Sequence, residues 1–443
     1  MRPPESRLDE LILAGLFLAG VFLACEGCAR PQVCDSLEQL AGVYRANVAK
    51  ANKGPTAARA LARARTLLRR EQLPDKAYAA LGEALRSYER PPKTIRTGRK
   101  PEQWLIKLLQ NELTRNERAL VTIRRARKRP AGLMPIDLLE LAANSDLALD
   151  LLKDVNGLWH QLRYAALLNL WNGHPREALE YVLDMITVEK ATAGVPAVGV
   201  SGWSVRVVCT AEEERTNEAA LLVALAGDLG AEDLALLAEA LRGTQTDTQA
   251  VLRQSLPYLR AWAVCYFDRT EAANPHGIKG SLDSLLPWPG NGARPVPAES
   301  ELLETIEQLR EDRAAYLALL AQYEKALQAP EVALSDVSPR PLGFVGGCLH
   351  PRLAAMQRVL RAHRSQRRAA VALLRVLAFR ARRSRLPLPD ELVLPEDPFR
   401  PGERMRYRHD ADRGRVGVFA LDVTRKAKKG QAELIGYWVA LDN

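Results

Sequence analysis

The chain has 443 residues, of which 47% are apolar and 26% charged, so it can bury a full core and is not a disordered chain. Aromatic residues make up only 6%, and Leu, Ala, Arg and Glu dominate, which favours helix over sheet. The net charge of +10 suits nucleic acid, anionic lipid or acidic protein as a partner, but also arginine on solvated helix faces, so charge alone names no partner.

Near its N-terminus the chain has an uninterrupted apolar run from Leu11 to Cys25. Its length suits the hydrophobic region of a signal peptide, whereas a comfortable membrane span needs about twenty residues. Three outcomes are open: acylation of Cys25 in a lipobox-like sequence, cleavage after the small residues that end at Ala29, or an uncleaved short anchor. Residues 1–29 therefore predict a membrane-anchored or exported envelope protein. The alternative is a cytoplasmic protein with a buried first helix.

Six cysteines in a chain of this length do not form the dense framework of a small disulfide-stapled domain. Cys25 and Cys28 form a C-x-x-C, but neither the strand–helix context of a redox motif nor a fourth zinc ligand lies nearby. Cys209 and Cys265 lie in apolar runs, and we expect both to be buried small hydrophobic residues.

Apolar periodicity predicts a succession of helices along the body. They are expected over residues 35–53, 56–70, 73–88, 101–127, 158–172, 175–188, 221–228, 232–241, 248–267, 299–327 and 353–385. Several of them form hairpins, and the one that turns at Gly173 resembles a tetratricopeptide unit. No fixed period links the hairpins, so the body is helical-repeat-like only.

Three stretches interrupt the helical pattern. Residues 91–98 are expected to form a loop, and residues 194–208 a packed loop or the start of an apolar helix. Residues 274–297 are rich in Pro and Gly and predict a loop that could serve as a partner groove or a hinge.

Two basic segments are candidate contacts for an anionic partner. They comprise Arg124, Arg125, Arg127, Lys128 and Arg129 at the end of one predicted helix, and Arg361, Arg364, Arg367 and Arg368 within the last one. A helix C-terminus favours cations through its dipole, and arginine stems can cover apolar surface, so capping and packing are the competing interpretation. Nucleic-acid binding is not favoured, because no base-reading motif or interleaved aromatic residues accompany the charges.

The chain contains no H-E-x-x-H, no G-x-S-x-G and no phosphate-binding G-x-x-x-x-G-K-[ST]. Its six histidines are far apart in sequence, and none pairs at helical spacing. We therefore predict no catalytic, cofactor-binding or metal-ligating residue. Assembly of a Cys348–His pair by the fold stays open.

Prolines after Arg385 end the last helix, and three β-like segments follow it. Residues 405–408, 416–421 and 433–440 predict a small antiparallel meander that packs on the preceding helix. The predicted turn that leads into it contains Asp397, Pro398, Phe399 and Gly402, and Tyr407 begins the sheet.

Leu394-Pro-Glu-Asp-Pro-Phe399, a glycine and then Met405-Arg-Tyr-Arg408 resemble a passage of type II secretion pseudopilins, in which a long helix also leads into a small antiparallel sheet. The module is still more similar to the end of large uncharacterised planctomycete-type bacterial envelope proteins, which have a signal or anchor and a long helical body. The pseudopilin-like pattern covers residues 353–443, with one extra residue between Phe399 and Gly402. Basic residues 424–430 replace the pseudopilin calcium loop, and the pseudopilin N-terminal helix is missing beside the module. The resemblance therefore implies a fold, without calcium binding or pseudopilin function.

The sequence predicts a mainly α protein in three parts. These are a signal or anchor segment (1–29), a helical-hairpin body (35–335) with a sub-boundary near residue 130, and a long helix with a small β module (351–443). The leading functional hypothesis is a non-enzymatic, envelope-anchored scaffold that binds a protein partner. The alternatives are polyanion or nucleic-acid binding through the basic helices, and a hydrolase with a cleft beside residues 274–297.

Overall fold

The structure, a computed structural model, describes most of the chain after the N-terminal segment. The described residues are 35–69, 73–74, 76–77, 80–81, 93–95, 100–143, 145–193, 199–226, 229–244, 248–273, 306–328, 334, 337, 353–426 and 432–441. The apolar run with Cys25, most of the predicted helix at 73–88 and the loop at 274–297 lie outside them. Among the described helices, none is both long enough and apolar enough to cross a membrane.

The chain is mainly helical, as the sequence predicts. Its helices are α2 (Asp35–Ala51), α3 (Ala57–Leu67), α5 (Gln103–Ala126), α6 (Leu138–Ala143), α7 (Ser145–Trp171), α8 (Pro175–Thr192), α9 (Gly199–Leu225), α10 (Ala231–Arg242), α11 (Thr248–Ala273), α12 (Ile306–Gln328) and α14 (Leu353–Arg383). Helix α9 begins at Gly199, so residues 199–208 are helical, in agreement with the alternative that this stretch starts an apolar helix. The difference from the prediction is that α9 continues without a break through residues 209–220 into the predicted 221–228 helix.

Local sequence explains where several helices begin and end. The Thr56 side chain accepts a hydrogen bond from the Arg59 amide at 3.3 Å and so caps α3. The α7–α8 hairpin turns at Gly173, whose positive φ of 80° suits glycine, and Pro175 then begins α8. At the other end of the body, Ser384 adopts a φ of 57° and its amide donates to the Arg380 carbonyl at 2.7 Å, which closes α14.

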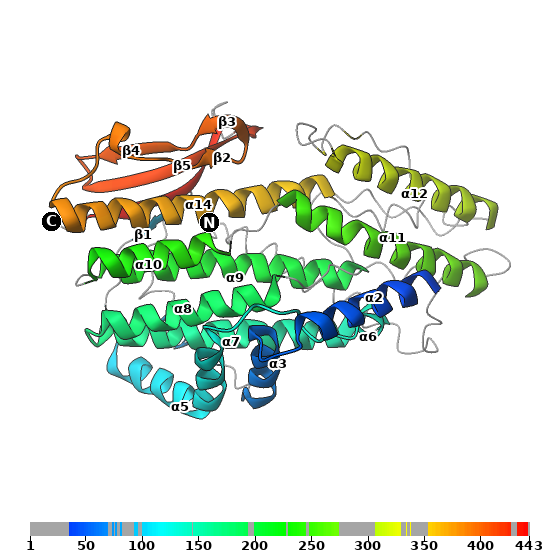
Figure 1. The fold of residues 1–443 in the computed structure, drawn as a ribbon, viewed down its shortest axis with the longest axis horizontal. Helices are drawn as coiled ribbons and strands as arrows, with labels where there is room; N and C mark the ends of the chain where they lie inside the picture. Colours follow the sequence, from blue (N-terminus) through cyan, green and yellow to red (C-terminus); the bar gives the residue numbers. More distant parts are fainter. Residues whose placement is uncertain are drawn as a thin grey trace.

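The helices stack in layers beneath a small sheet (Figure 1). Helix α14 lies directly under the sheet and packs on α9 and α10, which in turn lie on α7 and α8. Helices α3 and α5 form the opposite face. Helices α11 and α12 extend from one end, where they share a separate apolar cluster with the first turns of α14.

The sheet contains one strand more than the predicted meander. Strands β4 (Arg406–Asp410), β5 (Arg415–Lys426) and β6 (Ala432–Ala440) form the antiparallel part. Strand β1 (Lys93–Ile95), within the segment expected to be a loop, pairs with β6 in parallel, giving the order β1-β6-β5-β4. The loop prediction was wrong at these positions, because a three-residue strand shows no periodicity and its partner is remote in sequence.

A short hairpin of β2 (Glu396–Asp397) and β3 (Arg400–Arg404) carries the turn between α14 and the sheet. Asp397 accepts hydrogen bonds from the Phe399 amide at 2.9 Å and from the Leu421 amide at 2.8 Å, so one carboxylate ties the turn to β5. The Tyr407 hydroxyl donates to the Pro387 carbonyl at 3.2 Å. These contacts fix the proline-rich segment against the sheet.

One apolar core joins the body and the C-terminal module. It extends from Leu37 in α2 through Trp159 in α7 and Leu373 in α14 to Val418 and Val439 in the sheet. Because α14 belongs to both parts, the sheet folds onto a surface that the helical body completes.

The glycine at position 436 in β6 should be essential for sheet packing. A Cβ there would overlap the Val418 carbonyl oxygen and come within 3.0 Å of the Phe419 Cα, both of them backbone atoms. We expect Gly436→Ala to lower the free energy of unfolding by about 1–3 kcal/mol, measured by urea denaturation, because the strands must move apart.

Gly42 in α2 offers the matched control. Apart from its chain neighbours and the backbone of its own helix, no atom lies within 4 Å of the position that a Cβ would occupy. Because the residue is helical, Gly42→Ala should raise stability by about 0.5–1 kcal/mol. Equal effects of the two substitutions would contradict the close approach of β5 and β6.

Candidate functional site: a buried polar cluster around α9

The second half of α9 carries charged side chains into the centre of the body. Its sequence Glu212-Glu-Glu-Arg-Thr-Asn-Glu218 is surrounded by α7, α8, α14 and β6. We name the following twelve residues the α9 polar cluster: Asn156, His160, Arg163, Glu189, Glu212, Glu214, Arg215, Asn217, Glu218, Gln366, Arg367 and Tyr437. Its four glutamates are each no more than 4% exposed. Carboxylates this deeply buried require partners.

The most enclosed ion pair joins Glu189 of α8 to Arg367 of α14. Arg367 Nη2 lies 2.9 Å from Glu189 Oε1 and 2.8 Å from Oε2, and it also donates to the Glu213 carbonyl at 3.3 Å. The two side chains are 4% and 2% exposed. Arg367, which the sequence suggested as a contact for an external anion, is thus an internal structural residue.

A second group joins α9 to α7. Arg215 pairs with Glu212 one turn earlier, and its Nη1 lies 3.3 Å from His160 Nε2 and 3.4 Å from Asn156 Oδ1. The His160 ring stacks on Tyr164 with centroids 5.8 Å apart. This contact holds the imidazole beside the Arg215 guanidinium.

Two further contacts close the cluster. Gln366 Nε2 donates to Glu214 Oε1 at 2.9 Å, and Arg163 Nη2 lies 3.7 Å from Glu218 Oε2. Tyr437 of β6 is fully buried beside Glu214 and Glu218, and burial, followed by those two charges, raises its pKa well above the usual value. The cluster therefore connects four helices to the sheet.

Burial shifts the protonation of two members strongly. It raises the pKa of Glu212 to about 7, against the opposing effects of Arg215 and Arg163. It also lowers the pKa of His160 to about 3, and the charges of Arg215 and Arg163 add to that shift. At neutral pH the imidazole is therefore neutral, and Glu212 lies near the midpoint of its titration.

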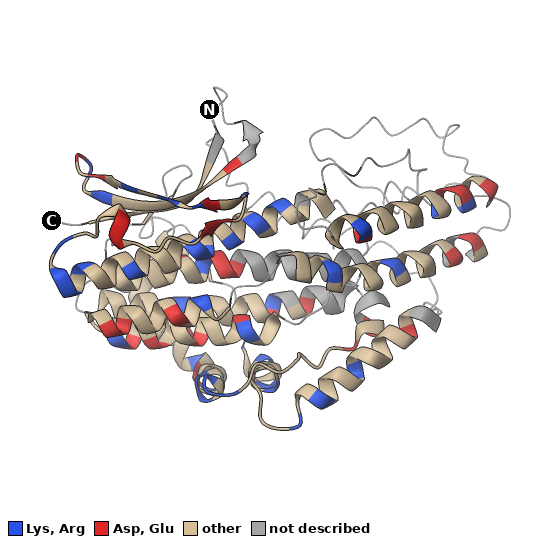
Figure 2. Cartoon of the chain, turned by 45° about the horizontal axis from the view of Figure 1, so that its top comes forward, with Lys and Arg blue, Asp and Glu red and all other residues tan. Residues whose placement is uncertain are grey.

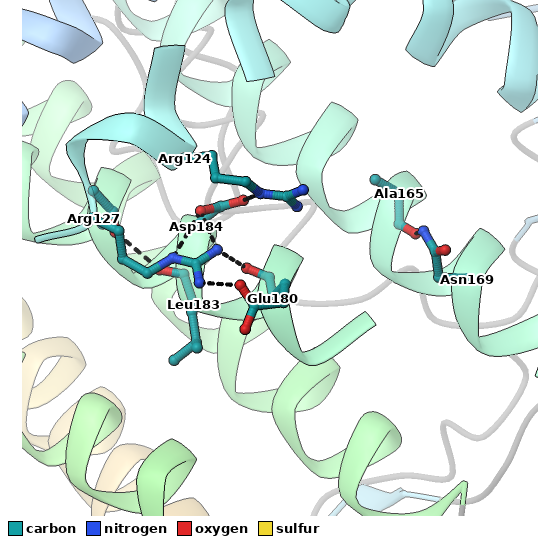
Figure 3. Close-up of polar contacts among 8 residues, drawn as sticks. Arg124, Arg127, Ala165, Asn169, Glu180, Leu183 and Asp184 are labelled. Atoms are coloured by element: carbon teal, nitrogen blue, oxygen red, sulfur yellow. Dashed lines mark hydrogen bonds and ion pairs between the residues drawn. The ribbon is translucent and has the colours of Figure 1, made fainter. Parts of the chain in front are cut away.

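The first predicted basic segment is divided by the fold (Figure 3). Arg124 and Arg127 both bind Asp184 of α8, with Arg124 Nε 3.0 Å from Oδ2 and Arg127 Nη2 2.6 Å from Oδ1. Arg127 also pairs with Glu180, and the Arg124 guanidinium lies 4.3 Å from the centre of the Tyr181 ring. These two arginines attach α5 to α8. Their neighbours are exposed: Arg125, Lys128 and Arg129.

The second segment is divided in the same way. Arg367 faces the α9 polar cluster, whereas Arg361, Arg364 and Arg368 are partly buried on α14 near the β2–β3 and β5 strands. Basic residues follow the whole length of α14 (Figure 2).

Cys265 in α11 is 7% exposed, in agreement with the prediction of a buried cysteine, but it also forms a disulfide bond. The side chains of the other five cysteines, Cys209 among them, lie outside those described. The sequence predicted Cys265 as a buried small hydrophobic residue and did not predict its disulfide bond. In most organisms a stable disulfide indicates an oxidising compartment.

The α9 polar cluster has chemically competent groups, of which the four glutamates are buried and His160 is partly exposed. A neutral imidazole and a carboxylic acid that titrates near pH 7 could exchange protons. The glutamates are nevertheless enclosed and matched to arginine or amide partners. Within the described part of the chain, no group of three or more His, Cys, Asp or Glu side chains could hold a metal ion.

Sequence reasoning missed this cluster. One signal was available, because Glu212–Glu218 is strongly charged although apolar residues follow at once from Ala219 to Leu225. A helix that changes from charged to apolar without a break can bury both parts if other helices supply the counter-charges.

Comparisons of the chain with protein-family models, with curated proteins and with solved structures found no match. The likeness of the C-terminal module to pseudopilins stays a prediction.

The Glu189–Arg367 pair should show strong coupling. Glu189→Leu or Arg367→Met alone leaves one buried charge without its counter-ion and should cost about 3–5 kcal/mol, whereas the double variant should cost far less than the sum. Urea unfolding of the four proteins of this cycle measures the coupling. If the loss of stability in the double variant equals the sum of the losses in the two single variants, the two side chains do not form an enclosed ion pair.

The exposed pair Arg400–Glu403, whose side chains are 32% and 50% exposed, is the control for that cycle. Glu403→Leu should change stability by less than about 1 kcal/mol, because water screens the charges.

Glu212 and His160 should give opposite pH dependences of stability. The folded-state pKa of Glu212, about 7, exceeds its usual 4.5. The stabilisation that Glu212 contributes to the folded state is therefore full below pH 4.5 and is lost as pH rises through 7. The folded-state pKa of His160, about 3, is below its usual 6.5. The stabilisation that His160 contributes to the folded state is therefore full above pH 6.5 and is lost as pH falls toward 3.

Thermal unfolding across this pH range tests both assignments. Glu212→Gln should remove the loss of stability on the alkaline side, on the order of 3 kcal/mol, and leave the acid side unchanged. His160→Gln should do the reverse. Unaltered pH profiles in both variants would exclude these two groups as the source.

Proposed function

We propose that the protein is a non-enzymatic, envelope-anchored helical scaffold that binds a protein partner. The observation that carries the proposal is that charged side chains of the body bind other helices of the same chain. The four glutamates of the α9 polar cluster are buried against arginine and amide partners, and Arg124 and Arg127 hold α5 on α8. Such groups fix the relative positions of helices and leave the outer helical faces for partners.

The envelope location draws support from two independent features. The apolar run from Leu11 to Cys25 has the length of a signal or lipoprotein segment. The disulfide at Cys265 is typical of proteins that fold outside the reducing cytoplasm.

The location is tested by cell fractionation together with mass spectrometry of the mature N-terminus. We expect the protein in the membrane or envelope fraction, with Cys25 acylated, the chain cleaved after Ala29, or the segment retained as an anchor. Intact protein that is freely soluble in the cytosol would overturn the proposal.

The disulfide gives a separate stability test. Cys265→Ser should lower the free energy of unfolding by about 2–5 kcal/mol under oxidising conditions, because the unfolded chain gains freedom. Mapping of unreduced peptides should find Cys265 linked to another cysteine and protected from alkylation.

The control for this test is the same comparison in reducing buffer, where wild type and Cys265→Ser should have nearly equal stability. A thiol at Cys265 that alkylates without prior reduction, in protein isolated from the envelope, would contradict an oxidised native state.

A further inference from the structure

Helix α5 presents a straight row of basic side chains to solvent. Lys107, Arg118 and Arg125 are eleven and seven residues apart, which is about three and two turns of an α-helix, so they point to one side. All three are exposed, whereas residues of the side that packs on the body, such as Leu109 and Ile123, are buried. The row therefore lies on the side of α5 that faces away from the core.

Helix α3 adds to this surface. Its Arg59 and Arg63 are exposed and lie one turn apart. The Ala57 amide donates to the Pro130 carbonyl at 2.9 Å, so the start of α3 is joined to the chain just after Arg129. Both helices lie on the α7–α8 pair, at the face of the molecule remote from the sheet (Figure 1). We name the following exposed residues the α3–α5 basic face: Arg59, Arg63, Lys107, Arg118, Arg125, Lys128 and Arg129.

Few acidic side chains accompany the basic face on its own helices. Residues 52–69 contain no Asp or Glu, and residues 103–129 contain two. Of these, Glu112 is buried and pairs with Arg115, whereas Glu117 is exposed. The outward sides of α3 and α5 are therefore strongly positive.

The side chains between the charges suit lipid better than nucleic acid. Val121, between Arg118 and Arg125, is exposed, although most large apolar side chains of the body are buried. The exposed residues of α3 and α5 include no Phe, Tyr or Trp. Basic residues around an apolar side chain fit the headgroup region of a bilayer, whereas single-stranded nucleic acid favours aromatic rings on which its bases stack.

We propose that the α3–α5 basic face binds the anionic headgroups of a phospholipid membrane. Lys and Arg close to an anionic leaflet are attracted to it, and each increases partition onto the membrane roughly fivefold. A straight row on one helix, extended by a second helix at its end, can approach a planar surface with most of its charges at once.

The sequence places a candidate membrane segment within reach of this face. Nine residues separate Cys25, at the end of the apolar run, from Asp35, at the start of α2. An extended chain of that length spans at most about 30–35 Å. Helix α2 then leads to α3 through residues 52–56. The choice of lipid as the partner therefore rests on the proposed membrane anchoring, whereas the charge of the face does not.

Chemical labelling of arginine on vesicles tests the orientation of the full-length chain. The chain is reconstituted on vesicles of phosphatidylglycerol and phosphatidylcholine in equal parts, and separately on pure phosphatidylcholine, and is treated with phenylglyoxal. Mass spectrometry should find Arg118 and Arg125 modified severalfold more slowly on the anionic vesicles. Arg382 and Arg383, exposed at the end of α14, should react equally on both. The protection should disappear at about 1 M salt, where charges are screened within about 3 Å.

Charge variants test the same face by affinity. Partition onto anionic vesicles, divided by partition onto neutral vesicles, cancels the contribution of the N-terminal segment. A variant that combines Lys107→Gln, Arg118→Gln and Arg125→Gln should lower this ratio about tenfold or more. The matched control removes three exposed charges near the sheet and should leave the ratio within about twofold of wild type. It combines Arg382→Gln, Arg383→Gln and Arg408→Gln. Both variants should unfold at the temperature of the wild type, because only exposed side chains change.

The possible outcomes separate the basic face from the membrane anchor. An equal fall of the ratio in both variants would be an effect of net charge and would overturn the proposal. Equal partition onto both kinds of vesicle, with Arg118 labelled equally, would also overturn it while leaving the anchor in place. A preference for anionic vesicles that requires the basic face would support the proposal even if the protein proved freely soluble in the cytosol, which would refute the anchoring alone. Salt-sensitive binding to a single-stranded oligonucleotide, without a preference for anionic vesicles, would refute lipid as the partner.

Discussion

The burial of charged side chains on α9 constrains most of this fold. Glu212, Glu214 and Glu218 lie at the centre of the helical layers, and Glu189 joins them from α8. Carboxylates at such positions are tolerated only with counter-charges and hydrogen-bond donors in place. Helix α7 must therefore supply Arg163, and α14 must supply Arg367 and Gln366, at one particular register.

Helix α14 connects this constraint to the C-terminal module, because its two sides have different roles. One side brings Arg367 to the α9 polar cluster, and the other brings Arg358 to the buried Asp422 of β5. The turn after α14 is attached to the same strand by Asp397. Two carboxylates of the module thus position it over a helix that the body has already fixed, and β1 from the body completes its sheet.

The helices and three strands of the sheet could be predicted from the sequence, because their signals are local. Gly173 and Pro175 mark the α7–α8 hairpin, and the prolines after Arg385 end the last helix. Strand β1 could not be predicted, because the strand that it pairs with, β6, lies at the other end of the chain.

The sequence also could not separate the roles of Arg361 and Arg367. Both lie in one basic run, and only the packing of α8 and β5 on opposite sides of α14 distinguishes them.

Buried ion pairs contribute little to stability on their own, since desolvation offsets much of the attraction. Their stronger effect is on specificity. Helices with broad apolar faces such as α7, α8 and α10 can pack in several registers with similar apolar burial, whereas a one-turn slip would leave Glu189, Arg163 and Arg367 without partners. We infer that the α9 polar cluster selects one helical arrangement among these. The proposed scaffold function would need that property, because a partner binds a surface whose shape depends on the registration of the helices beneath it.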